Sequence, residues 1–421
     1  MPSKNLIDEN EIKTKDKLFH YVEIFSFPRL AGSEGEKSAV KLTTETFKKI
    51  GFNENEIQRQ EFEFSTFYSE ELIKIIAFMS LILIAVLSFI KYIFPVLFFL
   101  TVISIFIIFL SMLKVLKHPE LKGFWENHFG KKVSATNVIV KIPAKKIPFE
   151  HANNLIISAH LDSKSQTVKT IWRVIFFIVW EIGGITLLIL FALFLIDFYF
   201  GTFKIILIIL ETCIIIILSL VIISIFMIII IKTGNKSKGA LDNASGMGLV
   251  FELSSIFRIA PLNNFNLWFC QFSAEEIGTM GSRFFVDTHE DFFKKGKTLH
   301  INFDMVSNIN SRKGGVEYIK SYGFLFQKNA SDLLDSYINK SANEQKIKIY
   351  GHRVLNGGHT DSIPFHLRKY DSIDITTLSA TKYSHGKSDT PDKIDSQVLL
   401  ETYKVIRRLI SMLDEVEIEV Q

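Results

Sequence analysis

Four long apolar segments constrain this chain more than any other feature of its sequence. They are Leu72–Ile90, Tyr92–Leu113, Ile171–Ile196 and Phe203–Ile231. A helix needs about 20 mostly apolar residues to cross the hydrocarbon core of a bilayer, and each segment reaches or approaches that length. Their many β-branched residues do not favour strands, because an open strand in lipid leaves backbone groups without hydrogen bonds. The sequence therefore predicts four transmembrane helices.

The four segments occur in two pairs with short connections, Lys91 in the first pair and Asp197–Gly201 with its neighbours in the second. Two helical hairpins would leave every long polar segment on the same side of the membrane. About 300 residues remain outside the hairpins, which is enough for one large α/β domain. We expect that domain in three pieces, residues 1–70, 114–170 and 232–421, interrupted by hairpins at 71–113 and 171–231.

Basic residues indicate which side of the membrane holds this domain. The hairpin tips carry only Lys91 and Lys204, whereas many basic residues flank the helices on the opposite side. The positive-inside rule then predicts a multi-pass membrane protein whose soluble domain is cytoplasmic. The flanking residues are Lys74, Lys114, Lys117, Lys122, Lys164, Lys169, Arg173, Lys232, Lys236 and Lys238.

The composition agrees with this assignment and excludes other classes. Of the 421 residues, 48% are hydrophobic, and the excess lies in the four apolar segments. Cys213 and Cys270 both fall in apolar stretches, so they indicate no disulfide framework and fit a reducing compartment. The formal net charge is only +4, and we find no basic helix or Cys/His finger spacing, so nucleic acid is not an expected partner.

Outside the hairpins, strand-like and helix-like stretches alternate along the chain. Ser33 and Glu36 have the spacing of a capping box at the start of a helix, which Gly51 would end. This alternation predicts an α/β fold with a mostly parallel, mixed sheet and helices on both faces. The expected helices are Lys13–Phe25, Ser33–Lys49, Met247–Arg258, Ser331–Asn343 and Ser396–Leu413, and the expected strands are Ile57–Phe64, Ala135–Ile142, Asn154–Ser158, Phe265–Ser273, Thr298–Asp304 and Ile347–Tyr350.

Acidic residues and histidines follow several of the apolar strand-like runs. In open α/β sheets the carboxyl ends of parallel strands converge on the ligand crevice. Two further residues lie in loops, Asp242 between glycines and His385 near the C-terminal helix. Two histidines with three carboxylates could hold one or two divalent metals, and imidazole ligands favour zinc. In chain order all the candidate site residues, from which such a ligand set would be drawn, are His160, Asp162, Asp242, Glu275, Glu276, Asp304 and His385.

The ordered set of motifs resembles the zinc exopeptidases of metallopeptidase clan MH, the family of bacterial leucyl aminopeptidases and glutamate carboxypeptidase II. The similarity covers nearly all the residues outside the hairpins. The motifs that carry it are Arg29-Leu30-Ala31-Gly32-Ser33-Glu34-Gly35, Ala135-Thr136-Asn137-Val138-Ile139, His160-x-Asp162, Asp242-Asn243-Ala244-Ser245-Gly246, Glu275-Glu276, Asp304 and His385 in His-x-x-x-Asp.

The resemblance implies two Zn²⁺ ions per chain, a peptide substrate and a division of roles. Asp242 would bridge the metals, His160 and Asp304 would complete the first ligand set, and Glu276 and His385 the second. Glu275 would be the general base, and Asp162 would orient His160, as carboxylates beside ligating imidazoles do. The implied activity is that of a membrane-embedded zinc aminopeptidase that releases N-terminal residues, although carboxypeptidase action stays open.

Two other functions remain alternatives. One is a glutaminyl-cyclase-like acyltransferase, whose relatives use a single zinc ion, and the other is a non-catalytic membrane receptor or scaffold that keeps the fold. One departure concerns the substrate side: the family often has Ser-Asp-His before Pro-Phe, whereas here Ser362 takes the place of that histidine and His359 precedes it. Roles for Glu181 and Glu211, inside apolar segments, stay open.

The second hairpin lies between His160 and Asp242 in the chain. If both residues serve one metal site, the helices of that hairpin should emerge beside the catalytic crevice. We therefore expect the site to open near the bilayer surface and to favour membrane-proximal or apolar peptides, with membrane lipids as the other partner.

Overall fold

The computed structural model describes residues 4–90, 100, 129–201, 204–309, 314–323, 327–354 and 360–415. The chain divides into two compact units. The first, which we call the α/β unit, consists of Met1–Phe64, Lys132–Ser165 and Gly234–Gln421. The second, the helical unit, consists of the two insertions Ser65–Lys131 and Gln166–Thr233.

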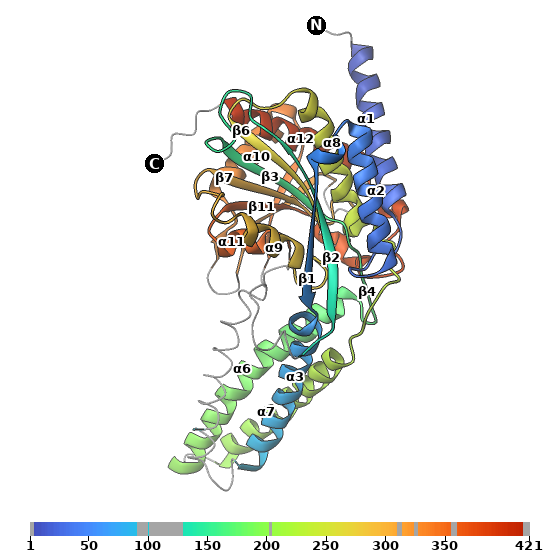
Figure 1. Cartoon of the computed structure of the whole chain (residues 1–421). Helices are drawn as coiled ribbons and strands as arrows, with labels where there is room; N and C mark the ends of the chain where they lie inside the picture. Colours follow the sequence, from blue (N-terminus) through green and yellow to red (C-terminus); the bar gives the residue numbers. More distant parts are fainter. Residues whose placement is uncertain are drawn as a thin grey trace. The chain divides into compact units, whose positions relative to one another are not determined.

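A nine-stranded mixed sheet forms the centre of the α/β unit (Figure 1). Its four central strands run parallel, and β2 and β8 are antiparallel to their inner neighbours. The predicted mostly parallel, mixed sheet is therefore confirmed. The strand order is β1 (Ile57–Ser65), β2 (Lys132–Ile142), β6 (Phe265–Phe272), β3 (Asn153–His160), β7 (Thr298–Phe303), β11 (Asp371–Ile375), β8 (Val316–Tyr322) and β10 (Ile349–Val354), with β9 (Lys328–Asn329) paired to β8.

Helices cover both faces of this sheet, because side chains on each buried strand alternate between two apolar layers. On β3, Leu155 and Ile157 belong to one hydrophobic cluster, whereas Ile156 belongs to the other. The larger layer holds α1 (Lys4–Phe25), α2 (Glu34–Ile50), α8 (Ser245–Ile259), α10 (Asp332–Gln345) and α12 (Ser396–Glu415), and the smaller holds α9 (Met280–His289) and α11 (Ile363–Leu367) (Figure 1).

Helix α2 begins and ends as the sequence predicts, but its capping box is incomplete. Ser33 accepts a hydrogen bond from the amide of Glu36, and Gly51 ends the helix in the left-handed conformation with φ of 112°. The Glu36 carboxylate instead accepts bonds from the Thr136 amide at 3.0 Å and the Ser273 hydroxyl at 2.9 Å. Glu36 is therefore a buried link from α2 to the sheet.

The helical unit contains α3 (Leu72–Ile90), α6 (Thr170–Phe200) and α7 (Lys204–Ile229), which share one apolar cluster. A β-carbon added to Gly183 on α6 would lie 2.4 Å from Val221 Cγ2 on α7, so this glycine permits close helix packing. A two-stranded ribbon, β4 (Ser165–Gln166) and β5 (Thr233–Gly234), joins the chain where it enters α6 and leaves α7.

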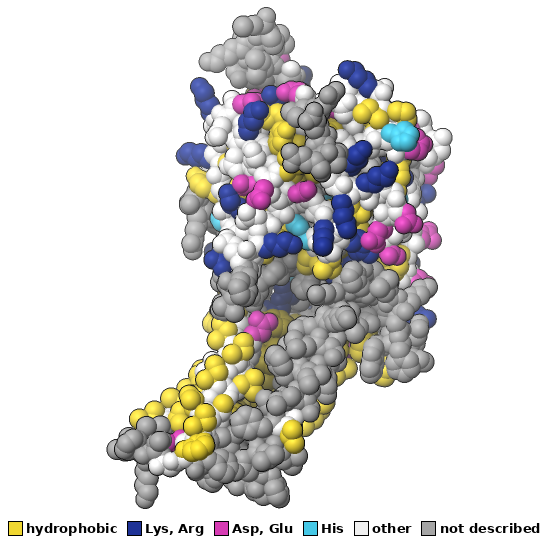
Figure 2. Space-filling view, turned by 90° about the vertical axis from the view of Figure 1, so that its left-hand side faces the viewer, with side chains coloured by type: hydrophobic (Ala, Val, Ile, Leu, Met, Phe, Trp, Pro, Cys, Tyr) yellow, Lys and Arg dark blue, Asp and Glu magenta, His cyan; other side chains and the backbone are white. Residues whose placement is uncertain are grey.

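Among the described residues, two helices are long and apolar enough to span a membrane, not the four that we predicted. They cover Thr170–Phe194 and Ile208–Ile229, with mean hydropathies of 2.5 and 3.2. The predicted segment Tyr92–Leu113 lies largely outside the described residues, so the first predicted hairpin is represented by α3. Hydrophobic side chains gather on the surface of the helical unit, whereas charged side chains are spread over the α/β unit (Figure 2).

Candidate metal centre

The sheet brings the predicted ligands to one edge. His160 is the last residue of β3, Asp304 follows the last residue of β7, and Glu276 comes shortly after β6. These strands are parallel neighbours, so their carboxyl ends meet. Asp242 lies in the turn Ala240–Ala244 before α8, and its peptide bond to Asn243 is cis. His385 lies in the loop after the short helix Leu378–Lys382.

Asp242 lies between two groups of ligand atoms and gives one carboxylate oxygen to each. In the first group His160 Nε2 lies 3.2 Å from Asp242 Oδ1 and 3.5 Å from Asp304 Oδ1. In the second, His385 Nε2 lies 3.3 Å from Asp242 Oδ2 and 2.9 Å from Glu276 Oε2. Within each group one ligand atom per residue lies within 4.8 Å of the others. The five predicted metal ligands are therefore arranged as two sets that share Asp242.

Three polar atoms at this edge are buried without a hydrogen-bond partner among the described residues. They are His160 Nε2, Glu276 Oε1 and Asp304 Oδ1. Buried polar atoms in native proteins almost always have a partner, so such atoms on three of the predicted ligands fit a site that binds a cation. Imidazole nitrogen and carboxylate oxygen are the donors that zinc binds. The residues present therefore fit a divalent metal.

Asp162 organises both sides of the site through different atoms. Its carboxylate accepts the amide hydrogens of Glu275 at 3.2 Å and Glu276 at 3.3 Å. Its main-chain oxygen lies 3.1 Å from His160 Nδ1, closer than its carboxylate oxygen at 3.5 Å. Because a carbonyl oxygen only accepts, this contact places the imidazole hydrogen on Nδ1 and leaves the Nε2 lone pair free for a metal. We had expected the carboxylate to orient His160; here the carbonyl makes the shorter contact.

Asp389 fixes the backbone at Asp242. Its carboxylate accepts the amide hydrogen of Leu241 at 2.6 Å and that of Asp242 at 3.2 Å. Burial, followed by the charge of Asp242, raises the pKa of Asp389 to about 7. The motif His-x-x-x-Asp therefore supplies both His385 and a residue that positions the shared ligand, a role that the sequence did not reveal.

Lys164 is a member of the site that sequence reasoning missed. Its ammonium group lies 2.9 Å from Glu276 Oε2 and donates to the main-chain oxygen of Glu276 at 2.8 Å. We had used Lys164 only as one of the basic residues that flank the second hairpin. The single signal in the sequence was its position two residues after Asp162.

The two adjacent glutamates have opposite electrostatic environments. Burial raises the pKa of Glu275 well above its ordinary value, and nearby Asp304 and Glu276 add to this, while His160 opposes it. Burial would also raise the pKa of Glu276, but His385 and Lys164 hold it well below its ordinary value. Neighbouring carboxylates whose environments separate their pKa values can take different roles. Glu275 Oε2 lies 3.9 Å from His160 Nε2, at the edge of the first ligand group.

A row of buried polar side chains continues from the ligands along the sheet face that α11 covers. Ser158 bonds to His300 Nε2 at 2.7 Å and donates to Asn302 at 2.8 Å, and Asn302 donates to Asp374 at 2.9 Å. Ser362 donates to the same Asp374 oxygen at 2.7 Å and has no exposed surface. Ser362 is thus part of this row rather than of a substrate-facing wall. His359, the other residue of that departure, lies outside the described residues.

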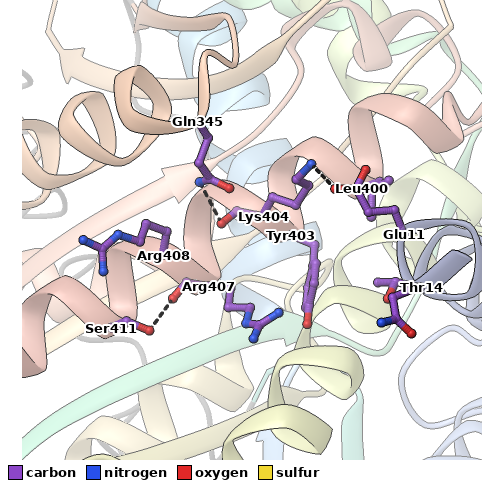
Figure 3. A pocket seen from close by; sticks show the side chains of 10 residues that line it. Glu11, Thr14, Gln345, Leu400, Tyr403, Lys404, Arg407, Arg408 and Ser411 are labelled. Atoms are coloured by element: carbon purple, nitrogen blue, oxygen red, sulfur yellow. Dashed lines mark hydrogen bonds and ion pairs between the residues drawn. The ribbon is translucent and has the colours of Figure 1, made fainter. Parts of the chain in front are cut away.

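A cavity of about 440 Å³ lies elsewhere on the α/β unit, where α1, α10 and α12 meet (Figure 3). Two of its basic side chains are ion-paired, Lys404 with Glu11 at 2.7 Å and Arg408 with Glu344 at 2.8 Å. None of the predicted metal ligands lines it. We therefore assign no ligand to this cavity.

Known structures with the same fold include aminopeptidases and glutaminyl cyclases. An aminopeptidase from Aneurinibacillus sp. strain AM-1 superposes with a TM-score of 0.55 at 13% identity, over 94% of this chain and 93% of that chain. BSAP, a zinc aminopeptidase from Bacillus subtilis, gives 0.55 at 12% identity, over 98% and 96%. A glutaminyl cyclase from Fimbriiglobus ruber gives 0.52 at 13% identity, over 94% and 95%. These likenesses define the fold as that of the zinc aminopeptidases.

Sequence comparison gives a more specific relationship. Residues 227–410 match the model of peptidase family M28, a stretch that includes four of the five predicted metal ligands. Aminopeptidase YwaD of Bacillus subtilis strain 168 is 27% identical over 170 residues, 39% of this chain and 35% of that protein, so the chain spans about a third of the length of this relative. Together the matches relate this chain to peptidase family M28 and to a bacterial aminopeptidase.

Proposed function

We propose that this protein is a membrane-embedded di-zinc aminopeptidase. The observation that carries the proposal is the pair of ligand groups that share Asp242. His160, Asp242 and Asp304 would hold one ion, and Asp242, Glu276 and His385 the other. Metals held in this way lower the pKa of a bound water and polarise a carbonyl oxygen.

Glu275 is the proposed general base. It follows β6 beside the first ligand group but belongs to neither group. Its raised pKa suits a carboxylate that accepts a proton from water and then gives it to the departing amine. Asp162 holds the Glu275 amide, so the base is anchored by the residue that also contacts His160. Proton transfer and ligand orientation thus depend on one loop.

Hydrolysis of aminoacyl-chromophore substrates tests the proposed activity. The full chain in detergent should release the chromophore when the amino group is free, and acetylation of that amino group should abolish release. Removal of metal with a chelator should stop the reaction, and added zinc should restore it. Cleavage of blocked peptides from the C-terminus instead would identify a carboxypeptidase.

A glutaminyl-cyclase-like reaction is the second candidate, because a glutaminyl cyclase shares the fold with nearly equal coverage. The ligand groups favour two ions over one, since both contain a histidine and two carboxylates. Metal content per active chain separates the candidates. A content of about two zinc ions per active chain would support the aminopeptidase. A protein that holds one ion and cyclises N-terminal glutamine would instead be a glutaminyl cyclase.

The membrane location is also a proposal. Only 17% and 28% of the two most apolar windows, in α6 and α7, are buried within the protein, whereas a core helix of a soluble protein would be mostly buried. Exposed apolar side chains on these helices, such as Ile185, Ile215 and Phe226, are suited to lipid. The positive-inside rule orients the α/β unit toward the cytoplasm. A cysteine introduced at Gly201 should react with an impermeant reagent only from the outside of intact cells.

A further inference from the structure

One buried guanidinium joins three segments of the α/β unit. Arg29 lies between α1 and α2, and its side chain has no exposed surface. Its Nε donates to the carbonyl of Leu161 at 2.6 Å, and its Nη2 donates to that of Gly239 at 2.8 Å. Its Nη1 donates to the carbonyls of Phe25 at 2.5 Å and Lys238 at 2.8 Å. The guanidinium therefore bonds to backbone on three separate stretches.

Ser163 reinforces the same junction. Its amide donates to the carbonyl of Arg29 at 3.3 Å, and its hydroxyl accepts the amide hydrogen of Arg29 at 3.2 Å. The hydroxyl also donates to the carbonyl of Ser237 at 3.3 Å. We refer to Arg29 and Ser163 together as the stem clamp, because they join the stretch 161–163 to the stretch 237–239.

The clamped stretches adjoin the predicted metal ligands on either side of an insertion. Leu161 lies between His160 and Asp162, and Gly239 precedes the turn that carries Asp242. Between the stretches the chain leaves to form residues 166–233 of the helical unit. A long intervening segment makes it entropically costly to bring its two ends together. The bonds of the clamp offset that cost at the place where His160 must meet Asp242.

The carbonyl groups at this junction suit the donor geometry of an arginine side chain. Guanidinium offers five donors in a fixed plane, whereas a lysine offers three on a flexible chain. Gly239 has a φ of +63°, and a β-carbon there would lie 2.6 Å from Ser163 Cβ and 2.8 Å from Arg29 Nη1. Only a residue without a β-carbon therefore lets the backbone at Gly239 lie this close to Ser163 and Arg29.

The positive charge of Arg29 interacts with carboxylates of the proposed metal centre. Burial lowers its pKa to about 10, while the carboxylates of Asp389 and Asp162 oppose that change. The group therefore stays charged at neutral pH. A buried cation beside so many carboxylates offsets part of their mutual repulsion.

We propose that the stem clamp positions the two ends of the inserted hairpin, in addition to the β4–β5 ribbon, so that His160 and Asp242 form one metal-binding group. Arg29 and Ser163 contact neither metal nor substrate in this account; they act through the backbone of Leu161 and Gly239. The inference rests on the proposed metal centre.

Zinc titration of the full chain in detergent, against a chromophoric chelator of known affinity, tests this role. Arg29→Lys should weaken zinc binding at the group that contains His160 and Asp242 by at least about tenfold, the usual effect of disturbing residues that orient ligands. Ser163→Ala should weaken it by about threefold, as expected for lost single hydrogen bonds. The matched control is Arg258→Lys, because Arg258 also joins separate segments, through Gly51 and Glu56, but away from the stems.

Hydrogen exchange supplies a readout without metal. In the zinc-free Arg29→Lys protein the amides of Leu241 and Asp242 should exchange faster than in the wild type, while amides of β6 should not. If the wild type binds no zinc, the metal-centre proposal itself fails. If the wild type binds zinc and both clamp variants bind it equally well with unchanged exchange, the clamp inference is overturned. If Arg29→Lys does not fold, Ser163→Ala decides by the same criteria.

Discussion

Lys164 and Glu276 form an ion pair inside the proposed metal centre, with the ammonium nitrogen 2.9 Å from Glu276 Oε2. The same oxygen lies 2.9 Å from His385 Nε2, so one carboxylate faces both a permanent cation and a proposed ligand. Glu276 Oε1 is left without a hydrogen-bond partner among the described residues. The second ligand group therefore contains a carboxylate that is ion-paired with a lysine.

Lys164→Met should tighten zinc binding at the second ligand group by at least tenfold. Two unit charges about 4 Å apart repel by about 4 kcal/mol at an effective dielectric constant of 20. The hydrogen bonds that Lys164 gives to Glu276 are worth only about 1–3 kcal/mol, so repulsion should dominate. Lys387→Met is the control, because it removes an equal charge from an exposed position near His385. Weaker zinc binding in Lys164→Met would show that the lysine orients the ligand instead.

Asp389→Asn should weaken both zinc sites together, because Asp242 serves both groups. The Asp389 carboxylate now accepts hydrogen bonds from two backbone amides. An asparagine side chain would present an N–H group to one of these amides and so lose that bond. Loss of such ligand-orienting bonds usually costs about ten- to a hundredfold in affinity. Isothermal titration with zinc measures this effect. The control is Asp392→Asn, a change at an exposed residue of the short helix Pro391–Lys393 that follows. A loss confined to one site would contradict the shared role of Asp242.

The zinc-free protein should lose stability as pH rises from about 4 to 7. Burial raises the pKa of Asp361 and Asp389 to about 7 and that of Asp374 to about 6, above their ordinary value of 3.8. In this interval each of these three carboxyls binds more protons in the folded state than in the unfolded state, so each lowers the free energy of unfolding as pH rises. They outnumber His300 and His366, whose pKa values burial lowers and which act in the opposite direction. Zinc competes with protons for the ligand side chains, so the stabilisation of the folded protein by zinc should increase as pH rises. Thermal unfolding with and without zinc at pH 5.5 and 8 measures this, and an equal zinc-induced shift at both pH values would refute it.

Peptides anchored in lipid vesicles should be cleaved faster than the same peptides free in solution. This expectation comes from chain order, because the apolar hairpin lies between His160 and Asp242. The comparison uses one aminoacyl-chromophore peptide with and without an acyl chain, at equal total concentration. Equal rates would remove the membrane-proximal preference and leave the hydrolase proposal intact.

The sequence predicted the parts of the fold that have strong local patterns. α6, α7 and β6 are long apolar runs, and Ser33 and Gly51 mark the ends of α2, so each was expected within a few residues of its observed bounds. β8 and β11 were not predicted. The segment Asp371–Ile375, which forms β11, is short and carries buried polar residues. Those side chains bond to distant segments of the chain, such as Asn302 and Ser362 for Asp374.

The ligand set could be proposed because its residues occur in motifs that follow the order of a known family. The residues that position the ligands could not be proposed from the sequence. Arg29 bonds to backbone carbonyls, which leave no trace in the sequence of the partner segments. Glu36 has the spacing of a capping residue, yet its carboxylate bonds to β2 and to Ser273. Lys164 reads as one of many basic residues near a hairpin. Such roles depend on contacts between distant segments.

The most direct test of the account compares wild type with Glu275→Gln in hydrolysis of an aminoacyl-chromophore substrate, with zinc content measured on the same samples. Glu275 belongs to neither ligand group, so the variant should keep its zinc. Loss of a general base should lower kcat by roughly a hundredfold to ten-thousandfold. Glu61→Gln, an exposed change on β1, should leave kcat unaltered. Equal kcat in wild type and Glu275→Gln at equal zinc content would contradict the proposed mechanism.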